Sequence, residues 1–471
     1  MASITKSSSN GDVNLTEGSI FKKLVIFSLP FIATNVLQLL FNAADVAVLG
    51  VFIKDVDRAD SAVAAVGSTG SFINLLVSLV VGLSVGTNVL LSRCVGENNQ
   101  EGASRVVSSS MALCLISSLL FSSIGVIFAR NFLILMNCDP EVLDMATKYL
   151  RIYFFGMPVI MIYNFASSIL RAVGNTLKAF YFLVIGGVLN IGINIFSTVV
   201  LHTDVEGVAA ATVISQAVSA ALAVVSLLRG KGFSHLSIKR IRLHKQESLK
   251  ILAIGLPTGI HGCVFSVSNM FVQTAVNALG KMHMAGYAIS VQIDGIFYQV
   301  MNSIAIASLT CVSQNLGAKN LGRVKKTMGV TLLLVTAVGL VMGAVMGLFG
   351  KEICSIMSKD RDVIEIAYRR LLIVGVPFFL CGIMEVFANV MRGLGRSLGA
   401  MAISIFGNCA IRIIWIHTIY AAFPAFDVLL LAFPVTWVIT LIIYTVYYFC
   451  VMNKIRRNFE RQEENVSEEN L

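Results

Sequence analysis

Long apolar runs recur along the whole chain, and they constrain its fold more than any other feature. Each has about 20 residues or more, the length that an α-helix needs to cross a hydrocarbon core of roughly 30 Å. Only 13% of the 471 residues are charged and 56% are hydrophobic, whereas soluble domains carry about 25% charged residues. We therefore predict an all-α integral membrane protein with twelve transmembrane helices, at residues 24–50, 62–92, 106–128, 148–170, 177–201, 207–229, 250–279, 284–312, 327–349, 364–392, 397–420 and 426–452.

The net charge of +10 is unevenly distributed among the connecting segments. If both termini share one side, the basic residues concentrate on that side, above all in segment 229–250. This bias is the positive-inside signature, so we expect both termini to be cytoplasmic and the basic charge to set topology without a nucleic-acid partner. We also expect the protein to lie in the plasma membrane. The predicted parts are a cytoplasmic N-terminal tail (1–23), an N-lobe (24–229), a cytoplasmic linker (230–249), a C-lobe (250–452) and a cytoplasmic C-terminal tail (453–471), with disordered tails.

The two predicted lobes carry matching short motifs in the same order. Gly156-Met-Pro158 resembles Gly375-Val-Pro377, and Ser92-Arg-Cys-Val-Gly96 resembles Ser313-Gln-Asn-Leu-Gly317. Corresponding helices are six apart, an even number, so both lobes share one orientation in the membrane. This predicts two six-helix bundles related by a parallel internal repeat, an arrangement that suits alternating access about a central cleft.

Asp45 is the most informative polar residue of the predicted membrane region. It follows Asn35, Gln38 and Asn42 at spacings that place all four on one helical face. In charge-poor membrane segments such residues mark functional sites.

Three further polar residues lie at a similar predicted depth: Asn190, Asn194 and Thr212. With Asp45 they predict either an oxygen cage for Na⁺ or a site at which the carboxylate exchanges a proton. The alternative is that the amides and the hydroxyl only bridge neighbouring helices.

The second half departs from this pattern. By the repeat, Asn408 stands opposite Asn190, Arg412 opposite Asn194, and Val272 opposite Asp45. Asp294 and Arg412 lie at similar depth, roughly 12–15 Å from the outer helix ends at 1.5 Å per residue. We predict that they form a structural or gating ion pair; the alternative is separate hydration in the cleft.

Glu385 is an acid of the second half alone, because Asn164 occupies its place in the first. It could bind a cationic substrate, carry a proton, or lie near the cytoplasmic water layer. His261 and His417 are expected to be packed, hydrogen-bonded residues. The predicted substrate cleft comprises Gln38, Asn42, Asn164, Asp294 and Glu385.

Several functions lack the motifs that they require. The chain has no GxxxxGK[ST] loop for ATP, no nucleophile–base spacing for catalysis, and no metal-binding spacing among its nine cysteines. We therefore expect no enzyme and no cofactor, and a transport process driven by an ion gradient.

The ordered motifs resemble the multidrug and toxic compound extrusion (MATE) family, in particular its DinF-like branch. The residues that carry the resemblance are Gln38-Leu-Leu-Phe-Asn-Ala-Ala-Asp45, Gly156-Met-Pro158, Arg171-Ala-Val-Gly174, Asn190-Ile-Gly-Ile-Asn194 and Gly207-Val-Ala-Ala-Ala-Thr212. The resemblance implies a cation-coupled exporter of bulky, often cationic organic compounds, in which the residues matching Asp45, Asn190, Asn194 and Thr212 couple the cation.

Two departures from the family leave H⁺ and Na⁺ open as the coupling ion. Many members carry Asp where this chain has Asn194, and segment 257–268 lacks an acid that another branch uses. With one carboxylate, a Na⁺ site should be weak, which favours the proton slightly.

Two rival functions remain at the level of the sequence. A flippase of lipids or lipid-linked oligosaccharides would share this architecture, but should have a more cationic cleft. A membrane receptor or embedded enzyme is the other rival, which the absence of catalytic spacing disfavours. We expect a monomer whose partners are small organic substrates and membrane lipid.

Overall fold

A computed structural model describes residues 13–52, 56–136 and 138–469, and every regular element in these residues is helical. The chain divides into two compact units, residues 1–259 and 260–471, and the division falls inside helix α8. The helices that begin in the first unit are α1 (Ile20–Phe52), α2 (Val56–Gly96), α3 (Gln100–Leu135), α4 (Leu143–Phe155), α5 (Met157–Ala172), α6 (Thr176–Val199), α7 (Val205–Arg229) and α8 (Lys245–Ala278).

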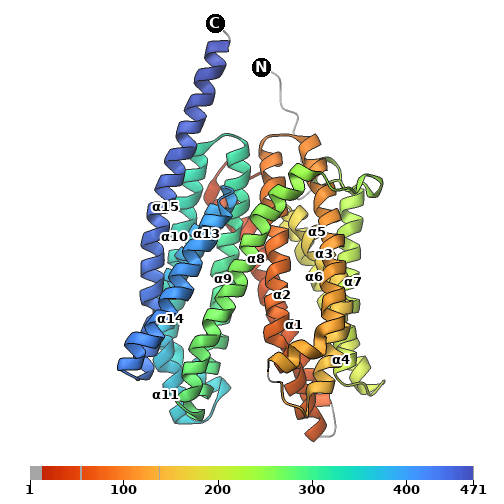
Figure 1. Cartoon of the computed structure of the whole chain (residues 1–471), viewed down its shortest axis with the longest axis vertical. Coiled ribbons are helices and arrows are strands. Elements are labelled where there is room, and N and C mark those ends of the chain that lie inside the picture. The colour runs from red at the N-terminus through yellow and green to blue at the C-terminus, as the bar shows by residue number, and fades with distance from the viewer. Residues whose placement is uncertain (1–12, 53–55, 137, 470–471) are drawn as a thin grey trace. The chain divides into compact units, whose positions relative to one another are not determined.

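The second unit continues α8 and adds seven α-helices. They are α9 (Lys281–Gly317), α10 (Leu321–Met357), α11 (Arg361–Arg370), α12 (Phe379–Gly393), α13 (Ser397–Ser404), α14 (Ile411–Trp415) and α15 (Phe426–Glu469). Within each unit the long helices run side by side (Figure 1). The lobe boundaries at 230–249 stay a prediction.

Among the described residues, eleven helical segments are long and apolar enough to cross a membrane. The pair α4 and α5, bent by 47° between its members, passes the same test when it is counted as one span, which gives twelve. All twelve predicted spans coincide with these segments. They are helical because a backbone exposed to lipid must satisfy its hydrogen bonds within the segment.

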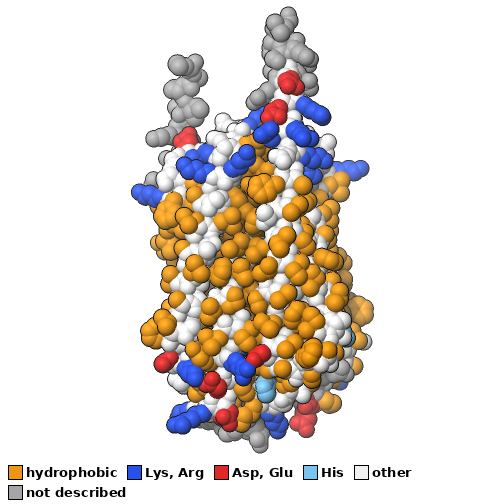
Figure 2. Space-filling view, turned by 90° about the vertical axis from the view of Figure 1, so that its left-hand side faces the viewer, with side chains coloured by type: hydrophobic (Ala, Val, Ile, Leu, Met, Phe, Trp, Pro, Cys, Tyr) orange, Lys and Arg blue, Asp and Glu red, His pale blue; other side chains and the backbone are white. Residues whose placement is uncertain are grey.

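Hydrophobic side chains form a band across the face shown in Figure 2. Lys and Arg side chains gather at the rim from which the end of α15 projects, while the opposite rim carries both signs. This is the distribution expected of a membrane-spanning protein.

The internal repeat recurs in the hydrogen bonds and backbone angles. The Ser92 hydroxyl donates to the Ala172 carbonyl at 3.3 Å, and the Ser313 hydroxyl donates to the Gly393 carbonyl at 3.2 Å. The side chains of Asn99 and Asn320 accept from backbone N–H groups at the starts of α3 and α10. These partners stand at equivalent positions of the two halves.

The glycines of the Arg-x-x-Gly motifs end helices in the same way. Gly174 has φ +96° and Gly395 has φ +77°, a left-handed conformation that glycine adopts without strain. The N–H groups of the following residues, Asn175 and Arg396, donate back to Leu170 and Met391. The repeated motif therefore encodes a helix terminus.

The Gly-x-Pro motifs mark breaks in both halves. The first half bends at Gly156, between α4 and α5. In the second half, a π-helical turn (Leu371–Gly375) and a 3₁₀ turn (Val376–Phe378) interrupt the span between α11 and α12. Proline explains both breaks, because it lacks the N–H of a helical hydrogen bond.

The described residues of both predicted tails have regular contacts or helical structure, which the sequence did not predict. Residues 1–12 lie outside the described part, but Val13 donates to the Gly174 carbonyl at 3.2 Å and Leu15 is buried. The apolar Leu15 anchors this segment against the first unit. Helix α15 runs to Glu469 and does not end near residue 452, since residues 453–469 contain neither Gly nor Pro.

Candidate cation-binding site

The candidate site of the first unit is built from α1, α6 and α7. Helix α6 packs against both neighbours, and its close approach to α1 depends on Gly187, whose missing side chain leaves room for the Phe41 ring. This packing brings the polar residues of α6 next to Asp45. Asp45 and Asn190 are buried, and Asn194 is fully buried.

The four predicted coupling residues form one hydrogen-bonded cluster. Asn194 Nδ2 donates to Asp45 Oδ1 at 2.5 Å and to Asn190 Oδ1 at 3.3 Å. The Thr212 hydroxyl lies 3.4 Å from Asp45 Oδ2 and accepts from Asn190 Nδ2 at 3.5 Å. The structure thus brings together all four residues from three helices.

The cluster contains one carboxyl group, Asp45, which has no basic partner among the described residues. None of the ion pairs among the described residues includes Asp45. Asn194 Oδ1 is buried and has no hydrogen-bond partner in the described part of the chain. An uncompensated carboxylate inside a membrane is costly, and oxygen ligands suit a hard cation. A bound Na⁺ or proton would relieve this cost.

Two tyrosines of α4 were not predicted as neighbours of this site. Tyr149 and Tyr153 lie within electrostatic range of the Asp45 carboxylate, and their rings stack with centroids 6.5 Å apart. No periodicity on α1 or α6 identifies them, because their proximity results from the packing of α4.

The other polar residues predicted in the first half lie outside this hydrogen-bonded cluster. Gln38 is half-buried and Asn42 is exposed. Asn164 is half-buried, and its Nδ2 donates to the Ile160 carbonyl of its own helix at 2.9 Å. Their assignment to a substrate cleft stays a prediction.

The predicted ion pair of Asp294 with Arg412 is wrong in this structure. Asp294 Oδ2 instead accepts from Arg370 NH1 at 2.5 Å, and both side chains are buried. The Arg370 guanidinium also lies over the Tyr287 ring, 4.6 Å from its centroid. Depth along the helices suggested Arg412, but the packing of α9 against α11 decides the partner. Arg370 lies within a predicted span. A basic residue at such a position was the sequence signal that could have identified it as a candidate partner of Asp294.

Arg412 is fully buried and has no acidic partner among the described residues. Its NH1 donates to Ser268 Oγ at 3.2 Å and to Asn269 Oδ1 at 3.1 Å, both on α8. Its Nε and NH2 have no hydrogen-bond partner, and the guanidinium lies 4.3 Å from the centroid of the Phe433 ring. The second unit therefore carries a cation at the place where the first carries Asn194.

Glu385 is buried, with the Tyr298 hydroxyl 3.5 Å from its Oε1. His261 is hydrogen-bonded as expected, through Nδ1 to Arg392 NH2 at 2.7 Å. His417 contacts the Ile413 carbonyl of its own helix.

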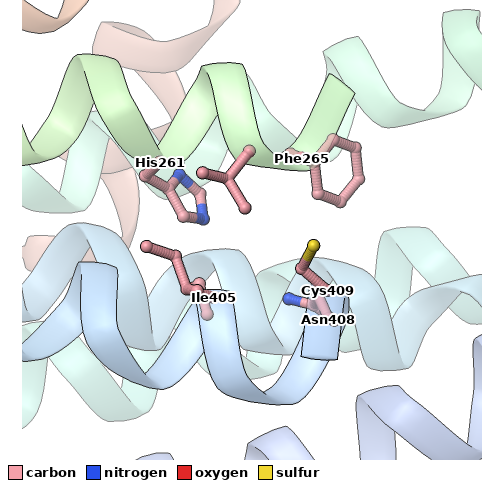
Figure 3. A pocket seen from close by; sticks show the side chains of 7 residues that line it. His261, Phe265, Ile405, Asn408 and Cys409 are labelled. Carbon is pink, nitrogen blue, oxygen red and sulfur yellow. The ribbon is translucent and has the colours of Figure 1, made fainter. Parts of the chain in front are cut away.

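A gap between α8 and the segment of Ser404 to Cys409 leaves His261 and Asn408 incompletely bonded (Figure 3). Arg392 donates to His261 Nδ1, so Nε2 carries the proton, and this N–H has no partner. Asn408 Oδ1 has none either. The gap leaves no room for a water molecule, and it holds no cluster suited to a metal. No group of three or more His, Cys, Asp or Glu residues that could hold a metal ion occurs in the described part of the chain.

Comparisons with known proteins match both halves of the chain. The family model MatE matches residues 30–196 and 257–416. The probable multidrug resistance protein YoeA of Bacillus subtilis is 26% identical over 447 residues, which cover 93% of this chain and 95% of that protein. The probable multidrug resistance protein NorM of Thermotoga maritima is 25% identical, with 82% of each chain covered.

Solved structures share the fold. A crystal structure of MATE in the bent conformation has a TM-score of 0.87 at 19% identity and covers 94% of this chain and 98% of its own. A transporter of the MOP superfamily from Pyrococcus furiosus, described as having a binding pocket of reverse polarity that suggests a different function, has a TM-score of 0.88 at 19% identity and covers 96% and 100%.

Proposed function

The chain belongs to the MATE family of membrane transporters, and from this premise we propose that it is a secondary-active multidrug exporter that exchanges H⁺ or Na⁺ for organic, mainly cationic, compounds. It is a multi-pass membrane protein and not an enzyme. The names of relatives such as YoeA and NorM support multidrug export. The plasma-membrane location, cytoplasmic termini, monomeric state and DinF-like branch belong to the same proposal.

The observation that carries the proposal is the uncompensated Asp45 carboxylate. It is 8% exposed and is surrounded by Asn194, Asn190 and Thr212, without a basic partner among the described residues. Such a cluster gains a cation more readily than it buries a bare charge. Asp45 would bind the coupling cation, and the amide and hydroxyl oxygens would complete its surroundings.

Coupling follows if the cation and the substrate favour different states of the transporter. A ligand shifts an equilibrium only through its different affinities for the two states. The parallel repeat supports alternating access by two bundles. The proposed cleft residues, Gln38, Asn42, Asn164, Asp294 and Glu385, would then contact the organic substrate.

The single carboxylate bears on the choice of ion. A Na⁺ site with one formal charge is weaker than one with two, whereas proton exchange needs only one carboxyl group. We therefore place H⁺ slightly ahead of Na⁺.

Efflux of a fluorescent organic cation from proteoliposomes tests this function. Wild type and Asp45→Asn are compared under separately imposed H⁺ and Na⁺ gradients. The matched control is Asp144→Asn, whose side chain is 77% exposed in a surface ion pair. We expect wild type and the control to respond to one gradient and Asp45→Asn to neither. Equal efflux by Asp45→Asn would contradict the proposal.

A flippase for lipids or lipid-linked oligosaccharides is the second candidate, favoured by one observation. The second unit buries three arginines, Arg370, Arg392 and Arg412, against two acids, Asp294 and Glu385. The surplus of positive charge among these buried residues suits an anionic headgroup. The sequence alone indicates fewer buried cations. Gradient-independent movement of a labelled anionic lipid across vesicles, lost in Arg412→Leu, would support this candidate.

A further inference from the structure

A cavity of about 650 Å³ opens at the start of α3, where the segment between α7 and α8 folds against it. Its lining includes Arg105, Lys239, Arg240, Arg242 and His244. All lie within the first unit, outside the cluster around Asp45. A proposed role in transport does not account for a basic cavity at this place.

The segment that forms the cavity wall is fixed to α3 by two buried serines. Ser108 Oγ accepts from the Arg242 N–H at 3.0 Å and lies within hydrogen-bond reach of the Arg240 and Arg242 carbonyls. Ser109 Oγ accepts from the His244 N–H at 3.1 Å and contacts His244 Nδ1 at 3.1 Å. The basic side chains therefore project from a backbone that these hydrogen bonds hold in place, so the cavity wall has a defined conformation.

Three of its cations lack an acidic partner. Arg105 is neutralised by Glu101 at 2.7 Å and Glu247 at 3.1 Å. Lys239, Arg240 and Arg242 are exposed and take part in none of the ion pairs between described residues. The cavity thus presents an excess of positive charge suited to a phosphate group.

Exposed apolar side chains alternate with these cations. Ile238 is 63% exposed and Leu243 is 50% exposed, and they flank Lys239, Arg240 and Arg242 in the chain. A free phosphate ion has no apolar group that could contact such side chains, whereas a phospholipid has acyl chains beside its headgroup. Interfacial segments of this composition insert apolar residues at the acyl boundary and hold basic residues at the phosphates.

We propose that this cavity binds the headgroup of an anionic phospholipid. Lys239, Arg240 and Arg242 contact the phosphate, while Ile238 and Leu243 contact the upper acyl chains. The bound lipid anchors the segment between α7 and α8 to the membrane surface. The site is independent of the cation cluster around Asp45.

Native mass spectrometry of the purified full chain tests the site. The probes are phosphatidylglycerol, phosphatidylcholine and inorganic phosphate, added separately and in competition. Wild type should bind phosphatidylglycerol in preference to phosphatidylcholine. Each single Gln substitution at the three cations should weaken this binding about fivefold, and the combined Lys239→Gln, Arg240→Gln, Arg242→Gln variant by roughly 100-fold.

Matched variants distinguish lipid binding at this site from a general effect of protein charge and from binding of free phosphate. Lys319→Gln with Lys325→Gln and Lys326→Gln removes the same charge from exposed residues near the start of α10 and should leave binding unchanged. Ile238→Ser with Leu243→Ser should weaken phosphatidylglycerol binding but not phosphate binding. Equal loss in the charge control, equal binding of phosphatidylcholine, or complete displacement of the lipid by inorganic phosphate would overturn the proposal.

Discussion

The two halves of the molecule place opposite charges on non-equivalent helices: the first buries an acid on α1, and the second buries an arginine on α14. In the first unit, Asn194 of α6 donates to Asp45 of α1 at 2.5 Å. In the second, Arg412 of α14 donates to Ser268 and Asn269 of α8, and the fully buried Val272 stands where the repeat would place Asp45. The donor is retained in each half, but the carboxylate is present in only one.

The helix caps and the left-handed glycines are more similar between the two halves than the charged residues inside the membrane are. The caps at Asn99 and Asn320 and the left-handed glycines at 174 and 395 are equivalent. These features fix helix ends, which both bundles need. The buried polar residues differ between the halves, and this difference supports our proposal that the first unit alone binds the cation.

The largest effect is expected where the second unit buries its ion pair. Arg370→Leu leaves Asp294 charged and unpaired, and should lower the free energy of unfolding by about 3–5 kcal/mol. Adding Asp294→Asn should restore much of it, as measured by denaturant unfolding in detergent. Adding Asp294→Asn to Arg412→Leu is the control and should give no such rescue; rescue there would reinstate the pair predicted from sequence.

A carboxylate installed in the second unit tests how similar the two halves are. Val272→Asp should find Arg412 nearby and be tolerated better than an isolated buried acid. In the Arg412→Leu background the same substitution should cost about 3 kcal/mol more. A double-mutant cycle of unfolding free energies measures this coupling, and a coupling near zero would show that the two positions are not equivalent to Asp45 and Asn194.

The close packing of α6 against α1 should make stability sensitive to substitution at Gly187 but not at Gly192. Gly187→Ala places a methyl group against the Phe41 ring and should destabilise by about 2 kcal/mol. Gly192 on the same helix has open space at that position. Thermal unfolding should leave Gly192→Ala close to wild type, and equal losses would argue against the tight α1–α6 contact.

The smallest effects should be the same in both halves. Asn99→Ala and Asn320→Ala each remove a helix cap, which should cost about 1 kcal/mol. Hydrogen exchange at the first turns of α3 and α10 checks this locally. A large loss in only one half would break the backbone equivalence.

The twelve spans and the Asp45 cluster could be predicted from sequence because both depend on local patterns. Hydropathy identifies helices in lipid, and the spacing of Asn190 and Asn194 places them on one face. Partners chosen by packing could not be predicted in this way. Arg370 lies near one end of its span, and only the contacts of α11 reveal that it reaches Asp294.

The basic cavity was missed for a related reason. Ser108 and Ser109 lie within a predicted span and look like ordinary membrane serines. Their role depends on backbone groups of Arg240, Arg242 and His244, more than 130 residues later in the chain. Local periodicity carries no information about such a contact.

The assignment of the coupling cation to the first unit is tested most directly by cation release on substrate binding. A fluorescent organic cation is added to purified wild type, Asp45→Asn and Asp144→Asn. Released H⁺ is followed with a pH indicator in weak buffer, and Na⁺ by displacement of a radioactive tracer. Wild type and Asp144→Asn should release one of the two ions and Asp45→Asn neither. Release by Asp45→Asn equal to that of wild type would contradict the assignment.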